Sequence, residues 1–514
     1  MMNKSIALLM GLVPAALAGQ TRPNVVLILA DDMGYSDLGC MGSEIETPNL
    51  DALSHEGVLM TNVCNVSKSC PSRAALLTGL YSWRAGMGAM TNEHSQIPAY
   101  QGYLNRHCVT IAEVLREAGY HTYLSGKWHV GDDPENWPEQ RGFEQTYHIP
   151  NGGGIYFYPS LFAERSNRPL IENGQQIQPP KGWYSTDGFT DRALSFIARP
   201  ENQTTPFFLY VPYIAPHYPL QAKPEDIDKY RDRYQAGYQA IRDARFAKQE
   251  ATGVVEPGFP LSKPEFKPWE QMNAKKQASE AERMAVYAAQ VDCIDQNVGR
   301  IVQALKDQGL YENTVIIFLS DNGAVMNHFN KTPDRPFGGP DCYASVGVWQ
   351  NVCNTPFRQG KGREYEGGIK TPLIISWPAG LRQHDCKVRD YAHIIDVLPT
   401  ILELTGTSYP RTFAGNEIQP LDGRSFLPLL EGRHINRNRP LFFEHMGWKG
   451  MRQGRWKIVH RNKKDLPWEL YDLKVDPYET TDIAGQHPVR TRKMARQWDR
   501  WAAEVGVEEW PLSR

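Results

Sequence analysis

The chain has 514 residues, of which 41% are hydrophobic and 22% charged, and its mean hydropathy of −0.51 is typical of a soluble globular protein. Its 56 Lys and Arg residues nearly balance 58 Asp and Glu residues, which leaves a net charge of −2. This balance excludes a nucleic-acid binder that neutralises phosphates over a basic surface, and the composition excludes a disordered polyanion. At roughly 150 residues per domain, the length alone predicts about three domains.

The first 19 residues have the features of a secretory signal peptide. Lys4 precedes an apolar run at 6–13, and Ala16-Leu17-Ala18 is a small-x-small cleavage site. The run is too short to span a bilayer, and no later segment reaches about 18 uninterrupted apolar residues. No Cys follows the cleavage region, so we expect no membrane anchor. The protein is therefore predicted to be exported, to the periplasm or the medium; the alternative is a buried N-terminal helix.

Apolar runs alternate with helix-like stretches over residues 20–410, which predicts a parallel α/β sheet with helices on both faces. Four of the predicted strands end in polar residues; these strands lie at 24–30, 121–125, 207–211 and 314–319. The polar residues that follow them are Asp31 and Asp32, Lys127 and His129, His217, and Asp321 and Asn322. Ligands of open α/β sheets bind at the carboxyl ends of strands, so we expect these side chains to share one rim.

Helices are predicted between the strands and after them, at 110–118, 190–197, 281–308 and 396–404, with a further strand at 371–378. Beyond about residue 410 the pattern changes to short alternating runs, at 441–444 and 456–459, with turns at Gly447, Gly450 and Gly454. We therefore predict two domains in place of three. The larger is an α/β unit over 20–410, and the smaller is an antiparallel sheet plus helix over 411–514.

The eight cysteines show no C-x-x-C spacing, so a zinc knuckle or a thioredoxin-type site is not expected. In an exported protein eight cysteines can form disulfides, but 105 pairings are possible and none can be assigned.

Four oxygen-bearing side chains lie at the predicted rim, namely Asp31, Asp32, Asp321 and Asn322. Carboxylate and amide oxygens suit Ca²⁺ or Mg²⁺ better than a soft metal. The alternative is that acidic pairs cap helices or lie in solvated turns. Two such pairs at the ends of buried strands favour the metal site.

The segment Ser69-Cys70-Pro71-Ser72-Arg73 begins a predicted helix, because Pro71 is typical of a first helical turn and Gly79 of a helix end. Backbone N–H groups at such a terminus favour an anion. A Ser, a Cys and an Arg at this terminus are candidates for nucleophilic chemistry. The alternative is an ordinary cap formed by Ser69 or Ser72.

Ser69-x-Pro71-Ser72-Arg73, followed by Leu77-Thr78-Gly79, resembles the signature of formylglycine-dependent sulfatases of the alkaline-phosphatase superfamily. The resemblance extends over nearly the whole mature chain, and the stretch 219–247 is similar to the arylsulfatase branch. Its other motifs are Asp31-Asp32, Gly126-Lys127-Trp128-His129, Ala215-Pro216-His217, Asp321-Asn322-Gly323, 354–358 with Lys361, Glu366-Gly367-Gly368 and 468–472. The resemblance implies a large mixed, mostly parallel sheet sandwiched by helices, with a smaller C-terminal domain of antiparallel sheet plus helix.

In this family the first signature residue, Cys or Ser, is oxidised to formylglycine, and by register that residue is Ser69. Cys70 occupies the variable second position. Hydrated formylglycine is a geminal diol: one hydroxyl attacks sulfur, and deprotonation of the other then expels sulfate. A serine at this position implies a bacterial-type maturation enzyme.

The resemblance also assigns the other site residues. The implied Ca²⁺ ligands are Asp31, Asp32, Asp321, Asn322 and modified Ser69. Lys127 and Lys361 are expected to clamp the sulfate, and Arg73 to hold the formylglycine and the metal shell. His129 is expected to be the base and His217 the acid that protonates the departing oxygen.

We therefore expect a sulfatase that hydrolyses a sulfate monoester, and export favours exo-acting removal of sulfate from a carbohydrate. The first alternative is a phosphoester or phosphonate-ester hydrolase of the same superfamily. Those that use an unmodified Ser or Thr need a second His- and Asp-rich metal site, which the sequence does not show. The second alternative is an inactive sulfated-glycan binding protein, if Ser69 is not oxidised. The segments 151–159 and 324–353 are candidate walls of the substrate pocket.

Overall fold

The computed structural model describes residues 22–93, 95–166, 168–435, 439–463 and 465–512. The predicted signal peptide at 1–19 lies outside these residues. Within the described ranges, no helix is both long enough and apolar enough to cross a membrane. All eight cysteines are free.

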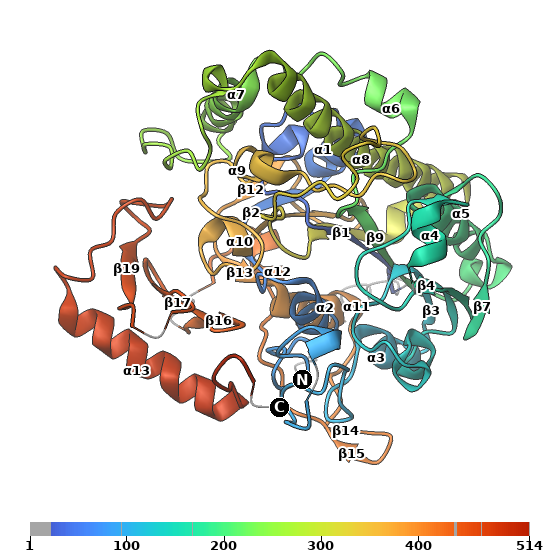
Figure 1. Ribbon diagram of the computed structural model, residues 1–514. Helices are drawn as coiled ribbons and strands as arrows, with labels where there is room; N and C mark the ends of the chain where they lie inside the picture. Colours follow the sequence, from blue (N-terminus) through green and yellow to red (C-terminus); the bar gives the residue numbers. More distant parts are fainter. Residues whose placement is uncertain (1–21, 94, 167, 436–438, 464, 513–514) are drawn as a thin grey trace, which may run out of the picture.

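An 11-stranded sheet forms the centre of the larger unit (Figure 1). Its middle strands β10 (Thr314–Ser320), β1 (Asn24–Asp31), β9 (Phe207–Pro216) and β3 (His121–Lys127) run parallel to one another. These strands are almost wholly buried, as their unbroken runs of Val, Ile, Leu and Phe predict. All four predicted strands are confirmed.

The sheet is mixed because β11 (Lys370–Ser376) pairs antiparallel with both β10 and β2 (Val58–Cys64). The far edge continues through β4 (Gln145–Ile149), β6 (Leu170–Glu172) and β7 (Gln175–Ile177), and β12 (Cys386–Val388) lies beyond β2. This mostly parallel mixed sheet between helices is the architecture that the resemblance implies.

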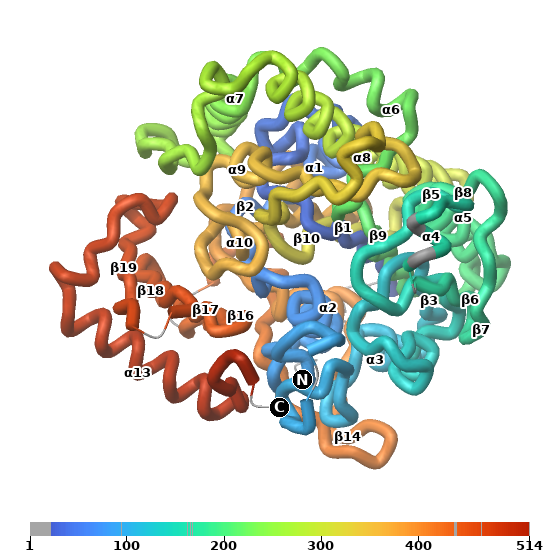
Figure 2. Tube along the Cα trace, viewed as in Figure 1, coloured from blue at the N-terminus to red at the C-terminus, as the bar shows by residue number. Residues whose placement is uncertain are grey.

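Helices cover both faces of the sheet (Figure 2). Successive side chains of each strand point to opposite sides, so each face of the sheet packs into its own hydrophobic core. Val26 and Ile28 of β1 pack toward the helices α1 (Pro48–Glu56), α5 (Ser185–Ile197) and α8 (Ala274–Asp307). Val25 and Leu27 face the other core, which contains α2 (Ser69–Thr78), α3 (Ile111–Glu117) and α11 (Val397–Thr405).

The predicted helices are confirmed, but two of them start earlier than expected. Helix α8 begins at Ala274 because the Asn273 side chain accepts a hydrogen bond from the Lys276 N–H. Helix α5 begins at Ser185, and its first turns contain residues of low helix propensity, so the sequence does not indicate this start. Gly188 of this helix packs directly against the Trp183 indole.

The C-terminal part contains a 4-stranded antiparallel sheet, β16 (Leu441–His445), β17 (Trp448–Gln453), β18 (Trp456–His460) and β19 (Glu469–Asp472), with helix α13 (Pro488–Val505) against it. Gly447 and Gly454 are the predicted turns. The predicted turn at Gly450 is wrong: Gly450 lies inside β17, opposite Phe443. A Cβ there would lie 3.1 Å from the Glu364 Cβ, so a close approach of the strand explains this glycine.

Candidate active site

The polar residues at the carboxyl ends of the central strands share one rim, as predicted. Asp31 ends β1 and Lys127 ends β3, while Asp321 directly follows β10 and His217 follows β9. The N-terminus of α2 faces the same rim, because Ser69 is the first residue of that helix.

Ser69 lies at the centre of the site and is only 1% exposed. Its hydroxyl donates a hydrogen bond of 2.7 Å to Asp321 Oδ2 and accepts one of 3.0 Å from Arg73 Nε. His129 Nδ1 lies 3.3 Å and Lys127 Nζ 3.4 Å from the same oxygen. The structure therefore places four other predicted site residues around the Ser69 hydroxyl.

Cys70, the neighbouring candidate, points away from this site. It packs in the hydrophobic core between the sheet and α2, and burial raises the pKa of its thiol to about 12. A thiol that stays protonated inside a core is a poor nucleophile. The geometry therefore supports Ser69 as the reactive position.

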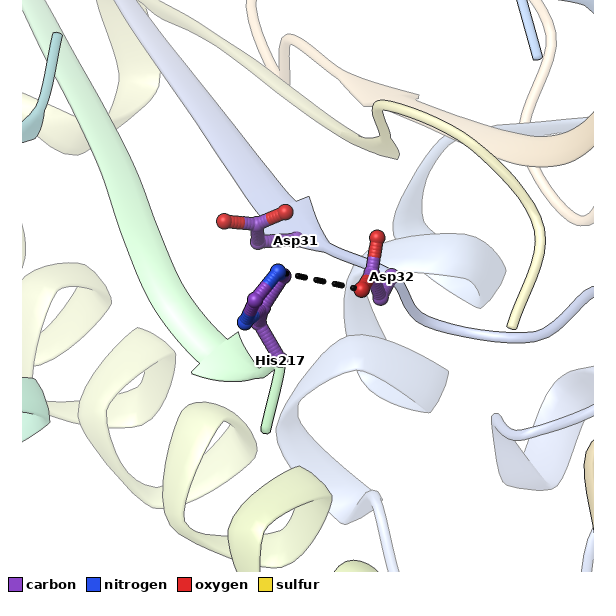
Figure 3. A group of neighbouring side chains, drawn as sticks. All are labelled: Asp31, Asp32 and His217. Carbon is purple, nitrogen blue, oxygen red and sulfur yellow. Dashed lines mark ion pairs between the residues drawn. The ribbon is translucent and has the colours of Figure 1, made fainter. Parts of the chain in front are cut away.

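Asp31, Asp32 and His217 form a compact group whose ligand atoms lie within 4.8 Å of one another (Figure 3). Three buried oxygens near the rim have no hydrogen-bond partner among the described residues: Asp31 Oδ1, Asp32 Oδ2 and Asn322 Oδ1. Buried oxygens are almost always satisfied, so their orphaned state points to a missing partner. A hard divalent cation such as Ca²⁺ fits this donor set.

Three cations are paired with these carboxylates. Lys127 Nζ forms an ion pair with Asp31, and Lys361 Nζ with Asp32. Arg73 Nη2 lies 3.1 Å from Asp321 Oδ2 and 3.5 Å from Asp31 Oδ2. Burial favours the neutral acid, but the charge of Lys361 and its hydrogen bond outweigh burial and hold the pKa of Asp32 below its usual value. The Asp32 carboxylate is therefore ionised.

The two histidines are held in their neutral forms. Burial and the charges of Lys127 and Arg73 keep the pKa of His129 well below its usual value, so its ring can accept a proton. Burial also lowers the pKa of His217, to about 4, although Asp32 and Asp31 oppose the shift. His217 Nδ1 donates to the Tyr218 carbonyl at 2.6 Å, which leaves Nε2 facing Asp32 Oδ2 at 3.5 Å. An acid role for His217 therefore begins with protonation at Nε2.

A cavity of about 610 Å³ opens onto the site. Both predicted wall segments contribute to it, through Asn151, Gly152 and Gly153 and through the stretch 325–327 with Tyr343. His129, His217 and Lys361 also line this cavity, so it leads to the reactive centre.

Comparison with known proteins identifies the family that these motifs resemble. The family model described as "Sulfatase" matches residues 23–407. The chain belongs to the sulfatase family. It is therefore an enzyme that hydrolyses sulfate esters. A second model, "N-sulphoglucosamine sulphohydrolase, C-terminal", matches residues 360–500.

Relatives of this sulfatase match it along most of its length. It is 33% identical to an uncharacterized sulfatase of Schizosaccharomyces pombe over 95% of each chain. It is also 33% identical to an arylsulfatase of Klebsiella aerogenes, over 83% of this chain and 96% of that one. The crystal structure of Ps i-CgsB in complex with k-i-k-neocarrahexaose is similar, with a TM-score of 0.70 and 28% identity over 94% of this chain and 93% of that chain.

The cavity of the sulfatase also contains residues that the sequence analysis did not single out, notably Lys68, Asp132 and Arg168. Lys68 had a local signal, since it directly precedes Ser69. Arg168 and Asp132 had none, because each lies in a loop that only the tertiary fold brings to the site.

Proposed function

We propose that this sulfatase removes a sulfate monoester from a carbohydrate and that Ser69 works as formylglycine beside a Ca²⁺ held by Asp31, Asp32, Asp321 and Asn322. The observation that carries this proposal is the enclosure of the Ser69 hydroxyl by Asp321, Arg73, His129 and Lys127, all within 3.4 Å. A hydroxyl set among cations, an imidazole and orphaned carboxylate oxygens suits attack on an anionic ester.

Hydrated formylglycine at position 69 would supply two hydroxyl groups, and Ca²⁺ held by the four oxygen-bearing side chains would lower a hydroxyl pKa and offset negative charge on the sulfate. Lys127 and Lys361 bind the sulfate oxygens. Arg73 orients the side chain at position 69 through its 3.0 Å contact. His129, neutral and 3.3 Å away, takes a proton from that side chain, and His217 delivers one to the departing sugar oxygen.

Several observations support a carbohydrate substrate. Relatives at 30% identity include N-acetylgalactosamine-6-sulfatases of dog and human. The cavity of about 610 Å³ lies in the size range of pockets for small ligands, which favours exo-acting removal of sulfate from a terminal sugar. We further propose export to the periplasm or medium through the segment 1–19, and a serine-type maturation enzyme as a partner.

The test combines mass spectrometry with turnover of 4-nitrophenyl sulfate, in a host that provides a serine-type maturation enzyme. The peptide that contains Ser69 should be roughly 2 Da lighter than its sequence mass, because oxidation removes two hydrogens. Ser69→Ala should abolish sulfate release. The matched Cys70→Ala should stay within about threefold of the native rate and lose only about 1 kcal/mol of stability, because Cys70 lies in the core.

Two results would contradict the proposal. Faster release of phosphate from 4-nitrophenyl phosphate than of sulfate would favour a phosphoester hydrolase. An unshifted peptide mass from the native host, together with no turnover, would favour a sulfated-glycan binding protein.

A further inference from the structure

Arg168 is one of the residues that line the active-site cavity. Arg168 is half-buried, and among the described residues no hydrogen bond or ion pair engages its side chain. Other buried arginines of this chain have protein partners: Arg73 pairs with Asp321, Arg245 pairs with Asp37, and Arg242 donates hydrogen bonds to Ser262. Arg168 is therefore an exception that calls for an external partner.

The electrostatic surroundings of Arg168 agree with its geometry. Burial lowers the pKa of Arg168, because the nearby tyrosines and Asp132 do not compensate for the lost hydration. A guanidinium stays charged even so, and its fork of N–H donors matches a carboxylate or a sulfate. An anion from solution would restore the interactions that this side chain lacks.

Two adjacent glycines place Arg168 beside the reactive centre. A Cβ on Gly152 would lie 2.3 Å from His129 Nε2, and a Cβ on Gly153 would lie 2.5 Å from Arg168 Nη1. Consecutive Cα atoms are about 3.8 Å apart, so the imidazole and the guanidinium lie no more than about 12 Å apart. One or two sugar rings can span that distance. Gly152 therefore lies against the His129 imidazole, and Gly153, the next residue of the same loop, lies against the Arg168 guanidinium.

The charge of the cavity wall favours a substrate with more than one negative group. The described residues that line it include the cations Lys68, Arg168 and Lys361, against a single carboxylate, Asp132. Of these cations, Lys361 is already paired with Asp32 and belongs to the reactive centre. Arg168 is thus available for a second anion on the same molecule.

We propose that Arg168 binds a second anionic group, a carboxylate or a further sulfate, on the sugar whose sulfate ester reacts at Ser69. The preferred substrate is then a saccharide with at least two negative charges. This inference rests on the proposed function and adds the substrate class to it.

The test measures binding in a Ser69→Ala background, so that it does not depend on turnover. Isothermal titration calorimetry compares N-acetylglucosamine 6-sulfate, which has one anionic group, with glucosamine 2-N,6-O-disulfate and with a uronate-containing disaccharide of 6-sulfated N-acetylglucosamine. We expect at least one of the two-anion sugars to bind about 10- to 100-fold more tightly than the single-anion sugar. Tighter binding of the disulfated sugar would identify the second anion as a sulfate, and tighter binding of the uronate-containing disaccharide would identify it as a carboxylate.

Substitutions at Arg168 then identify the side chain responsible. Arg168→Ala should remove the preference, and Arg168→Lys should keep part of it, because the charge remains but the bidentate fork is lost. The matched control Arg382→Ala alters an exposed arginine outside the cavity and should keep the full preference.

Equal binding of the one-anion and two-anion sugars would overturn the inference. So would an Arg168→Ala variant that is folded by thermal melting and weakens all sugars equally. Failure of the proposed function looks different: the fully oxidised enzyme would release no sulfate, whatever the binding preference.

Discussion

Asp32 and His129 both have backbone φ angles in the left-handed region, +67° and +60°. Such conformations cost about 1–3 kcal/mol in a non-glycine residue and persist only where the surroundings hold them. Each residue follows shortly after a buried strand, β1 or β3, whose neighbours fix its backbone. The fold thus holds Asp32 beside Lys361, and His129 beside the Ser69 hydroxyl, at the expense of local strain.

Calcium should raise the melting temperature of the sulfatase. Asp31, Asp32 and Asn322 have orphaned oxygens for it, and a ligand at about 100 times its dissociation constant stabilises a protein by about 2.7 kcal/mol. Thermal unfolding after EDTA treatment, repeated with increasing CaCl₂, measures the effect. Asp32→Asn should reduce the shift, whereas Asp334→Asn in an exposed loop should retain it. A melting temperature that is independent of CaCl₂ would contradict the metal assignment.

The loop at 151–154 leaves room for the His129 imidazole because residue 152 has no side chain. Because Gly152 is not in the left-handed region, an alanine there is tolerated by the backbone, but its Cβ would lie 2.3 Å from His129 Nε2. Gly152→Ala should therefore displace the imidazole and lower kcat/KM roughly 100-fold with little change in melting temperature. Steady-state kinetics with 4-nitrophenyl sulfate measures this.

Gly485→Ala is the matched control for this loop, since its Cβ would meet no atom within 4 Å. Its activity should equal that of the native enzyme. If Gly152→Ala were equally active, the close approach of the loop to His129 would have no role in catalysis.

Much of the fold was predictable because buried parallel strands have a strong local signature. The apolar runs at 24–30 and 314–319 predict β1 and β10, and the polar residues that follow them predict the active-site rim of the sheet. Gly450 was misread because a glycine that lets a strand pass close to Glu364 has the same local signature as a turn. The starts of α5 and α8 were missed because they depend on packing against Trp183 and on a cap.

The site was predictable where residues lie in contiguous motifs and not where the tertiary fold assembles it. Ser69, Arg73, Lys127 and His129 lie within two short segments. Arg168 belongs to the cavity only because the chain after α4 (Leu161–Arg165) returns to Gly153. No local pattern encodes that return.

The two units of the molecule are joined by a buried cluster of charges. Lys457 of β18 lies 2.7 Å from Glu366 of α10 (Glu366–Ile369) and 2.8 Å from Glu479. All three side chains are at most 2% exposed, so the cluster is shielded from water. It connects the C-terminal sheet to helix α10, which directly precedes β11.

Lys457→Ala should destabilise the protein by about 3–5 kcal/mol, because it leaves the buried Glu479 without its cation, while Glu366 keeps Lys370 at 3.1 Å. Chemical denaturation, followed by fluorescence, measures the loss. Lys474→Ala, an exposed lysine without an ion pair among the described residues, should change stability by less than about 0.5 kcal/mol. A loss below about 1 kcal/mol for Lys457→Ala would show that the cluster does not hold the units together.

The enclosure of Ser69 also limits when a maturation enzyme can reach its side chain. The contact that closes over its hydroxyl comes from Asp321, 252 residues later in the chain. At about 5–20 residues per second, a ribosome needs roughly 10–50 s to add that length. During this interval the nascent chain cannot yet build the pocket, and the serine is open to an enzyme that modifies it. After the sheet closes, a side chain with 1% exposure is out of reach. The proposed oxidation therefore has to precede folding.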